Sequence, residues 1–333
     1  MLVRDLIVVG GGPAGLATAI AAQRRQLSYL VLEKGVLVNS VYRFPVHMVF
    51  FTTPDLLEIG NLPFVTPYEK PTRLEALRYY RRVVDTYGLE ISLGEEVTAI
   101  ERESLGDDVF SVATRSQRGV RRVLHARAVV MAIGYYDYEN RLNVPGEDLP
   151  HVAHFYREPH AHYRQHVVVV GGRNSAAETA LELYRAGAHV TLVHRRPTLA
   201  DSIKYWVKPD IENRIAEGSI AARFDSSLVE IRPTEVVIER LGMHEELPAD
   251  AVYLMTGYHA DTALLRSAGI AIDAATDAPV YDSRTFETNV PNLFVAGGTV
   301  SGRDTAPIFI ENGRFHGEAI VEVVAERLAL QPK

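Results

Sequence analysis

The chain has 333 residues, of which 47% are hydrophobic and 23% charged, a balance typical of a globular protein with about two domains. Its formal net charge is −7, with 35 Lys and Arg against 42 Asp and Glu, so no positive excess favours binding to nucleic acid or to an anionic membrane. No apolar run reaches the roughly 18 residues of a membrane-spanning helix, and no signal peptide follows Met1, so we expect a cytoplasmic protein.

The sequence contains no cysteine. This composition excludes disulfides, thiolate zinc sites, cysteine-held iron–sulfur clusters and thiol nucleophiles. It also means that the protein cannot store electrons in a redox-active dithiol. Any redox chemistry of this chain therefore requires a bound cofactor.

The N-terminal 34 residues predict a strand–helix–strand unit. A strand over residues 6–9 leads into a glycine turn at 10–15, a helix over 16–25 and a second strand over 29–32. Short continuous apolar runs are typical of strands that are buried on both faces of a parallel sheet. Two such strands around a helix, within about 30 residues, predict a βαβ unit.

Further along the chain the same pattern returns once. After an amphipathic helix over 72–87, antiparallel strands are expected at 108–114 and 120–125, and two similar strand ends at 129–135 and 251–258. A loop rich in His, Pro and Tyr spans 145–164. The second βαβ unit has strands at 167–170 and 190–193, a glycine turn at 171–175 and a helix over 176–186. A strand at 293–296, a glycine-rich turn and a helix over 307–328 complete the chain.

The first glycine turn satisfies the pattern G-x-G-x-x-G between a strand and a helix. Gly10 permits the tight turn, Gly12 lets the main chain approach a pyrophosphate, and Gly15 allows close packing of helix and strand. The helix N-terminus then directs N–H groups at the phosphates. Glu33 ends the second strand, where an acid binds ribose hydroxyls. We therefore predict a dinucleotide site here.

The second glycine turn is a relaxed form of the motif. Arg173 replaces the middle glycine, while Ala176 remains small enough for helix packing. No acid ends the following strand, and His194, Arg195 and Arg196 stand there instead. Guanidinium groups bind the 2′-phosphate that an acid would repel, which favours NADP(H) over NAD(H). The alternative is a solvated basic strand end, because surface arginines are common.

Two dinucleotide sites of opposite charge predict FAD in the first and NADPH in the second, so that hydride passes from nicotinamide to flavin. We therefore predict an α/β fold with two Rossmann-like dinucleotide-binding domains, the NADPH domain being inserted in the FAD domain. The expected FAD-binding domain covers residues 1–137 and 255–333, and the expected NADPH-binding domain covers 138–254.

At this point the sequence resembles the thioredoxin-reductase-like branch of the two-dinucleotide-binding flavoproteins, and within it the bacillithiol-disulfide reductase (YpdA/Bdr) family. The stretches that carry the resemblance are residues 42–47, 50–51, 59–64, 134–136, 171–176, 202–204 with Trp206, and 308–317. The resemblance implies FAD, NADPH, a cytoplasmic setting and reduction of a low-molecular-weight thiol disulfide. We also expect a homo-oligomer, either a dimer or a tetramer.

The resemblance implies binding residues for both cofactors beyond those of the glycine motifs. Further FAD contacts are expected at Pro13, Ala14, Lys34, Tyr42, Pro45, His47, Phe51, Thr52, Val97, Ala132, Gly134, Gly297, Gly298, Thr305, Ala306 and Pro307. The NADPH contacts are expected at Gly171, Gly172, Arg173, Asn174, Ser175, His194, Arg195, Arg196, Lys204 and Gly257. His47 is the candidate proton donor to a leaving thiolate, since histidine side chains often act as general acids near neutral pH. A packed aromatic loop with a hydrogen-bonded histidine is the alternative interpretation of this segment.

The chain departs from the family pattern at two positions. Members often carry a cysteine where this chain has Ala14. At residues 297–299, which read Gly-Gly-Thr, the wider superfamily usually has an acid that holds the flavin ribitol, and Asp304 is a candidate to compensate. Residues 304–307 resemble a helix start with a capping side chain and a proline, whose dipole would stabilise reduced flavin.

Three alternatives remain open from the sequence. Electrons from the flavin go either to a small disulfide or to a ferredoxin or flavodoxin, or the chain is a flavin-binding redox sensor that does not turn over. Five histidines between residues 151 and 166 are expected to lie in a surface loop, because no thiolate accompanies them as a metal ligand. We therefore expect no metal site.

Overall fold

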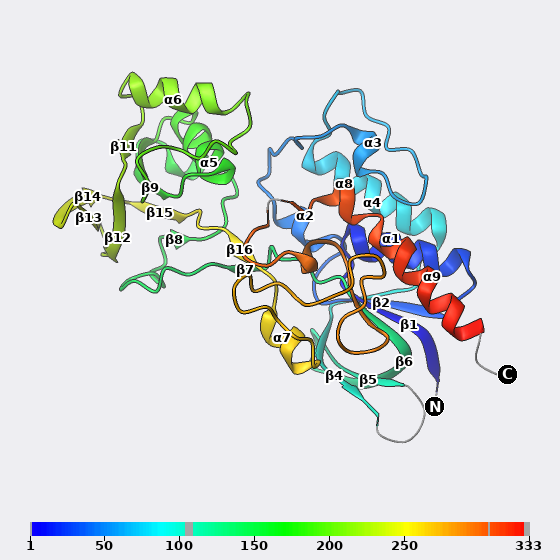
Figure 1. Cartoon of the computed structure of the whole chain (residues 1–333). Helices are drawn as coiled ribbons and strands as arrows, with labels where there is room; N and C mark the ends of the chain where they lie inside the picture. Colours follow the sequence, from blue (N-terminus) through cyan, green and yellow to red (C-terminus); the bar gives the residue numbers. More distant parts are fainter. Residues whose placement is uncertain (1, 104–108, 306, 330–333) are drawn as a thin grey trace. The chain divides into compact units, whose positions relative to one another are not determined.

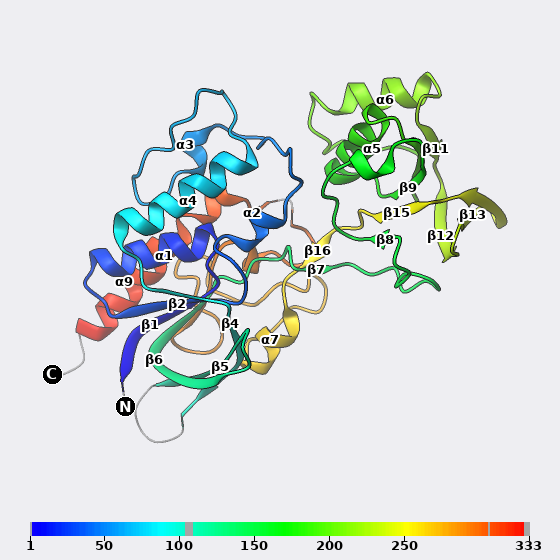
Figure 2. The same ribbon diagram turned by 180° about the vertical axis from the view of Figure 1, so that it is seen from behind.

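The computed structural model describes residues 2–103, 109–305 and 307–329. Asp108, which begins one of the expected strands, and Ala306, an expected FAD contact, lie outside the described residues. The chain divides into two compact units (Figures 1 and 2). The first comprises Met1–Arg43, Met48–Tyr138 and Tyr258–Lys333, and the second comprises Phe44–His47 and Glu139–Gly257.

The first unit is built on a seven-stranded mixed sheet. Its order is β3-β2-β1-β6-β5-β4, and β17 also pairs with β6. Neighbouring strands are parallel except at the β4–β5 and β5–β6 pairings. Residues 6–9 of β1 are buried, as their continuous apolar run predicts. The strands are β1 (Val3–Val9), β2 (Tyr29–Glu33), β3 (Ile91–Leu93), β4 (Glu95–Arg102), β5 (Phe110–Ser116), β6 (Arg121–Met131) and β17 (Leu293–Val295).

Three long helices of the first unit lie together beside β1 and β2 (Figures 1 and 2). They are α1 (Pro13–Arg24), α4 (Arg73–Tyr87) and α9 (His316–Ala329). Helix α4 begins with a capping box, in which the Thr72 side chain accepts from the Glu75 N–H and Glu75 accepts from the Thr72 N–H. Helices α1 and α9 pack closely because residue 317 is glycine: a Cβ added there would lie 2.5 Å from the Thr18 hydroxyl.

Shorter helices complete the first unit. They are α2 (Asn39–Arg43), α3 (Pro54–Leu57), α7 (Thr262–Ser267), α8 (Ile310–Gly313) and the 3₁₀ turn η2 (Gly297–Val300). The chain passes between the units after Arg43, after His47, within β7 (Tyr138–Glu139) and just before β16 (Tyr258–His259). Strands β7 and β16 are short and pair with each other.

The second unit contains a parallel sheet in the order β11-β10-β9-β15-β8. Strand side chains alternate between its two faces: Val167 and Val169 pack with α5 and α6, whereas Val168 and Val170 pack with an antiparallel sheet, β12-β13-β14. The elements are β8 (Val152–Ala153), η1 (His160–His162), β9 (His166–Val170), α5 (Asn174–Arg185), β10 (His189–Val193), α6 (Lys208–Ala216), β11 (Ala221–Arg223), β12 (Ser226–Ile231), β13 (Glu235–Arg240), β14 (Met243–Pro248) and β15 (Ala251–Leu254).

The predicted α/β class, with two Rossmann-like units, is confirmed, and two element predictions are wrong. The strands expected at 120–125 and 129–135 are one strand, β6, which pairs with β5 through its first half and with β17 through its last residues. The helix expected over 307–328 begins only at Ile310 and is divided into α8 and α9. Gly313 and Gly317 flank the break, and glycine weakens a helix.

Candidate functional site

The first glycine turn joins β1 to α1 through close main-chain contacts. Gly10 has φ +112°, and a Cβ added to it would lie 2.3 Å from the Ala132 carbonyl oxygen. A Cβ added to Gly15 would lie 2.0 Å from the Gly10 carbonyl oxygen. At Gly12 an added Cβ would meet no atom within 4 Å, and no side chain caps α1, which begins at Pro13. The turn therefore leaves open space against main-chain N–H groups, which fits a pyrophosphate.

Glu33 ends β2 beside this turn. One carboxylate oxygen accepts a 2.7 Å hydrogen bond from the Gly11 N–H, and the other accepts a 2.7 Å bond from the Gly35 N–H. Burial raises the pKa of Glu33, although both hydrogen bonds favour the ionised form. Next to it, Lys34 forms a 2.9 Å ion pair with Asp137. The acid that we expect at the FAD ribose is therefore held firmly against the glycine turn.

The C-terminal ends of the parallel strands β1, β6 and β17 lie close together near Ala14. The Gly134 N–H, after β6, donates a 3.0 Å hydrogen bond to the Thr299 hydroxyl, after β17. Gly297 has φ +59°, and a Cβ added to it would lie 2.6 Å from the Ala14 Cβ. The Gly297 N–H donates to Nδ1 of buried His316 at 3.1 Å. Burial lowers the pKa of His316 to about 4, so its imidazole is neutral and Nδ1 accepts.

The expected flavin-lining segment is anchored by Arg73, which the sequence reading missed. This buried residue donates through Nε to the Val41 and Tyr42 carbonyl oxygens, each at 3.2 Å. Its main-chain N–H donates to the Met48 carbonyl oxygen at 2.9 Å. Arg73 therefore holds the chain on both sides of residues 43–47. Its only sequence signal is its place after the Thr72 cap.

The expected residues of this segment fall into different parts of the molecule. Tyr42 is exposed, and Phe51 and Thr52 are half-buried, in the first unit. Pro45 and His47 belong to the second unit, and His47 is exposed. Val97, expected as an FAD contact, lies on β4 with its side chain buried in the core of the first unit.

The helix start expected at residues 304–307 is wrong. Helix α8 begins at Ile310, and the Phe309 N–H before it donates to the Asn312 side chain at 2.9 Å. Asp304 and Pro307 are exposed and precede the helix, and Thr305 is half-buried. Asn312 also donates to the Pro307 carbonyl oxygen at 2.7 Å, which turns the chain before the helix instead of extending it. The expected dipole at residues 304–307 is therefore absent from the described chain.

The second glycine turn lies between β9 and α5. Gly171 has φ +153°, and a Cβ added to it would lie 2.7 Å from the Met255 carbonyl oxygen. A Cβ added to Gly172 would lie 2.3 Å from the His194 ring. Arg173 and Ser175 are exposed at the start of α5, and no side chain caps this helix. As in the first unit, main-chain N–H groups of the helix start are available to a phosphate.

A loop after β10 is tied to this turn through Asn174. The Asn174 side-chain oxygen accepts from the Lys204 N–H at 2.9 Å, and its amide donates to the Ser202 carbonyl oxygen at 3.3 Å. On α5, burial and the neighbouring Glu182 raise the pKa of the Glu178 carboxyl group to about 7, and the positive charge of Lys204 only partly opposes this rise. The sequence reading missed Glu178, which occupies an ordinary helical position.

Two exposed arginines follow β10. Among the residues that the structure describes, the guanidinium groups of Arg195 and Arg196 have no ion-pair or hydrogen-bond partner. The neighbouring His194 is kept neutral, because burial and both arginines lower its pKa. Its Nε2 is buried without a hydrogen-bond partner in the described chain. This strand end therefore offers two unpaired cations to an anionic ligand.

Gly257 lies at the end of the second unit. It has φ +91°, and its carbonyl oxygen accepts a 2.9 Å hydrogen bond from the Asn140 N–H.

The histidines of residues 151–166 make their own contacts: His162 Nε2 lies 2.7 Å from the Tyr253 hydroxyl, and His154 lies 3.4 Å from Glu147. Within residues 2–103, 109–305 and 307–329, no group of three potential metal ligands comes together.

Two glycine turns at uncapped helix starts, one beside a buried acid and the other beside two exposed arginines, define a two-dinucleotide-binding oxidoreductase. A family model described as pyridine nucleotide-disulphide oxidoreductase matches residues 7–297. The chain belongs to this family, and its cofactors are FAD and NADPH. No helix in the described part of the chain is long and apolar enough to span a membrane.

Similar proteins cover nearly the whole chain. The protein named bacilliredoxin reductase Bdr, from Bacillus subtilis (strain 168), is 39% identical over 329 residues, which are 98% of this chain and 99% of that protein. The solved structure of bacillithiol disulfide reductase Bdr (YpdA) from Bacillus cereus is 40% identical, with a TM-score of 0.96, and the match covers 98% of this chain and 100% of that one. A ferredoxin–NADP reductase from Ignicoccus hospitalis is 28% identical over 301 residues, which are 88% of this chain and 89% of that protein. The predicted resemblance to the YpdA/Bdr family is thus confirmed.

Proposed function

We propose that the chain reduces a low-molecular-weight thiol disulfide, bacillithiol disulfide or a close analogue, with NADPH as the electron source. The overall reaction is NADPH + H⁺ + RSSR → NADP⁺ + 2 RSH. The observation that carries the proposal is the end-to-end similarity to Bdr proteins, in a chain with two dinucleotide turns. Bound FAD supplies the chemistry that links the two halves, since it accepts hydride and releases two electrons.

We assign FAD to the first unit and NADPH to the second. The open main chain at Gly12 and the buried Glu33 support binding of the FAD pyrophosphate and ribose. The uncapped start of α5 and the exposed Arg195 and Arg196 support binding of the NADPH phosphates. Thr305 and Pro307 remain candidate FAD contacts through their main chain, without the helix dipole.

Electron transfer to the acceptor occurs without a protein thiol in this proposal. Ala14 stands where family members often carry cysteine, and the whole sequence lacks cysteine. The electrons therefore pass from the cofactor to the disulfide without a mixed disulfide between substrate and protein. Cleavage of the disulfide releases a thiolate, and we assign exposed His47 as the proton donor to it.

We further propose that the enzyme works in the cytoplasm as a homo-oligomer, either a dimer or a tetramer. The cytoplasm is the compartment in which low-molecular-weight thiols are kept reduced, which is what this reaction accomplishes. Light scattering after size-exclusion chromatography measures the number of subunits directly. A monomer at micromolar concentration would contradict this part of the proposal.

A second candidate acceptor is a ferredoxin or flavodoxin. The observation in its favour is the similarity to the ferredoxin–NADP reductase from Ignicoccus hospitalis, together with the lack of cysteine in this chain. The names of the Bdr relatives also point to two different acceptors, a bacilliredoxin protein and bacillithiol disulfide. Each of these acceptors can be tested on one preparation of enzyme.

The decisive experiment separates flavin reduction from flavin reoxidation under anaerobic conditions. NADPH should first bleach the flavin absorbance of the holoenzyme, and bacillithiol disulfide should then restore it. Bacilliredoxin in its oxidised form, other small disulfides and oxidised ferredoxin are compared in the same assay. Reoxidation by the disulfides no faster than in buffer would refute the proposed acceptor, and fast reoxidation by ferredoxin would establish the second candidate. A flavin that NADPH leaves oxidised would instead indicate a sensor.

A further inference from the structure

Tyr135 packs against the main chain of Gly298 in the first unit. Tyr135 follows Gly134 after β6, and Gly298 lies in η2 after β17. A Cβ added to Gly298 would lie 2.8 Å and 3.0 Å from two carbon atoms of the Tyr135 ring. The φ angle of Gly298 is outside the left-handed region, so its main chain does not require glycine. The tyrosine ring is therefore what excludes a side chain at position 298.

The hydroxyl group of Tyr135 is available to a ligand. The residue is half-buried, and its hydroxyl forms no hydrogen bond with any residue in the described ranges. Burial raises the pKa of Tyr135, so the hydroxyl stays protonated and can donate a hydrogen bond. Tyr138 differs in this respect, since its hydroxyl already donates to Asp261 at 2.7 Å.

The position of Tyr135 in the sheet indicates the nature of this ligand. In open α/β sheets, dinucleotides bind outside the carboxyl ends of the parallel strands. Tyr135 stands at this edge with the first glycine turn, because β6 pairs with β1 on one side and with β17 through its last residues. The Ala132 carbonyl oxygen lies against Gly10, and Ala14 lies against Gly297.

We propose that Tyr135 binds FAD at this edge of the sheet, beside residues 297–299, which carry no acid. Its ring fills the space that an acidic side chain would need, and its neutral hydroxyl donates a hydrogen bond to an oxygen atom of the cofactor. This inference rests on the assignment of FAD to the first unit and not on the identity of the electron acceptor.

Tyr135→Phe tests the hydroxyl group alone, because phenylalanine keeps the ring against Gly298. The dissociation constant of FAD is measured by titrating the flavin-free protein and following flavin fluorescence. We expect a rise of about three- to tenfold, the effect of one lost hydrogen bond. Tyr87→Phe is the matched control, since its hydroxyl contacts the Gly60 carbonyl oxygen near the C-terminal end of α1, and should leave the constant unchanged. An unchanged constant in Tyr135→Phe would show that the tyrosine only fills space, which would overturn the proposal.

A pair of variants tests the space-filling part. Gly298→Asp should weaken FAD binding at least tenfold, because the new side chain meets the Tyr135 ring. Tyr135→Ala in the same chain should recover much of the loss. Equal binding by Gly298→Asp and the parent protein would contradict the proposed exclusion. If Gly298→Asp does not fold, Gly298→Ala with and without Tyr135→Ala makes the same comparison with a single carbon atom.

These measurements need no electron acceptor, so they stand apart from the proposed reaction. A holoenzyme that binds FAD with the expected pattern but fails to reduce any disulfide would count against the acceptor alone. A parent protein that does not bind FAD in titration would overturn this inference and the cofactor assignment together.

Discussion

Arg195 and Arg196 are suited to distinguish NADPH from NADH, because the two coenzymes differ only in the 2′-phosphate. Replacing both arginines by alanine should raise the KM for NADPH about 10- to 100-fold, the effect of losing hydrogen bonds to a charged group. The KM for NADH should change less than about threefold. Steady-state oxidation of NADPH and of NADH, each over a range of coenzyme concentrations, measures the two KM values.

Arg185→Ala is the control for this double variant. Arg185 is another exposed arginine of the second unit, but it is paired with Asp210, so its loss should leave the preference between the coenzymes unchanged. Parallel rises in the two KM values after loss of Arg195 and Arg196 would contradict the proposed phosphate site. They would favour the alternative of a solvated basic strand end.

His316 should make the stability of the first unit dependent on pH. Its pKa is about 4 in the folded protein and roughly 6.5 in the unfolded chain. Between these two pH values the proton binds to His316 in the unfolded chain but not in the folded protein. The contribution of His316 to the free energy of unfolding is therefore fully present above pH 6.5 and is lost as the pH falls towards 4. We expect a loss of about 1–2 kcal/mol between pH 7.5 and pH 5 from this residue.

Urea unfolding of the parent protein and of His316→Asn at both pH values measures this contribution. Asparagine can still accept from the Gly297 N–H but does not titrate, so the variant should lose less stability on acidification. An identical pH dependence in both proteins would mean that His316 is not the group responsible.

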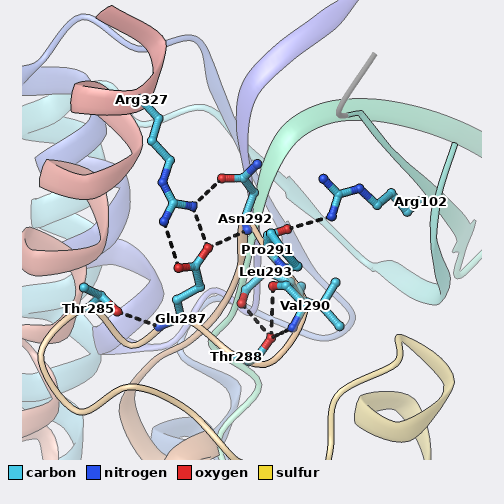
Figure 3. A network of polar contacts seen from close by, with 9 residues as sticks. All are labelled: Arg102, Thr285, Glu287, Thr288, Val290, Pro291, Asn292, Leu293 and Arg327. Carbon is cyan, nitrogen blue, oxygen red and sulfur yellow. Dashed lines mark hydrogen bonds and ion pairs between the residues drawn. The ribbon is translucent and has the colours of Figure 1, made fainter. Parts of the chain in front are cut away.

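At the scale of elements, one polar network fixes α9 to the segment before β17 (Figure 3). Arg327 of α9 donates to both carboxylate oxygens of Glu287 and, at 2.7 Å, to the Asn292 side chain. Glu287 also accepts from the Asn292 N–H at 2.8 Å. Because β17 is followed closely by residues 297–298, this network supports the strand that leads into the proposed FAD site.

Glu287→Gln should destabilise the first unit by about 1 kcal/mol at pH 7, since it removes a charge-assisted pair with Arg327. Arg327 lowers the pKa of Glu287, so the carboxylate stabilises the fold above its unfolded pKa and the effect disappears as the pH falls through the lower folded value. The difference between parent and variant should therefore shrink below about pH 4. Thermal unfolding over this pH range is the measurement.

Arg303→Ala serves as the control for this pair. Its ion pair with Asp277 is much more exposed than that of Glu287 with Arg327, and exposed pairs contribute little. A loss of stability in Glu287→Gln that is no larger than in Arg303→Ala would argue against a supporting role of the network.

Local signals explain which elements the sequence predicts correctly. Thr72 and Glu75 mark the start of α4, and Gly88 marks its end. Each cap is formed between residues only a few positions apart, so the sequence alone reveals it. The helix expected from Pro307 is wrong, since proline after a potential capping residue also occurs in ordinary loops. Here Asn312 holds the Pro307 carbonyl oxygen and delays the helix start.

Contacts between distant segments could not be predicted in the same way. Arg73 binds the carbonyl oxygens of residues 41 and 42, and Tyr135 lies against Gly298, but neither pair is close in the sequence. The glycine turns are recognisable because their function requires particular residues at fixed spacing. The contact between the Tyr135 ring and Gly298 joins two distant segments and follows no fixed sequence spacing.

For the whole molecule, the number of electrons that it can store depends on the cofactor alone. The chain has no cysteine, so no dithiol can accept the electrons that reach FAD. Flavoenzymes with a redox-active dithiol store four electrons per subunit, two in FAD and two in the dithiol. This chain should store two.

Anaerobic titration with dithionite measures this capacity, and complete reduction should require about two electrons per FAD. Iodoacetamide added to the NADPH-reduced enzyme should leave the rate of acceptor reduction unchanged, because reduction exposes no thiol for it to alkylate. Thioredoxin reductase, treated in parallel, is the positive control for alkylation. Uptake of four electrons, or inactivation by iodoacetamide only after reduction, would mean that a second redox group takes part. Either result would refute direct transfer from the flavin to the acceptor.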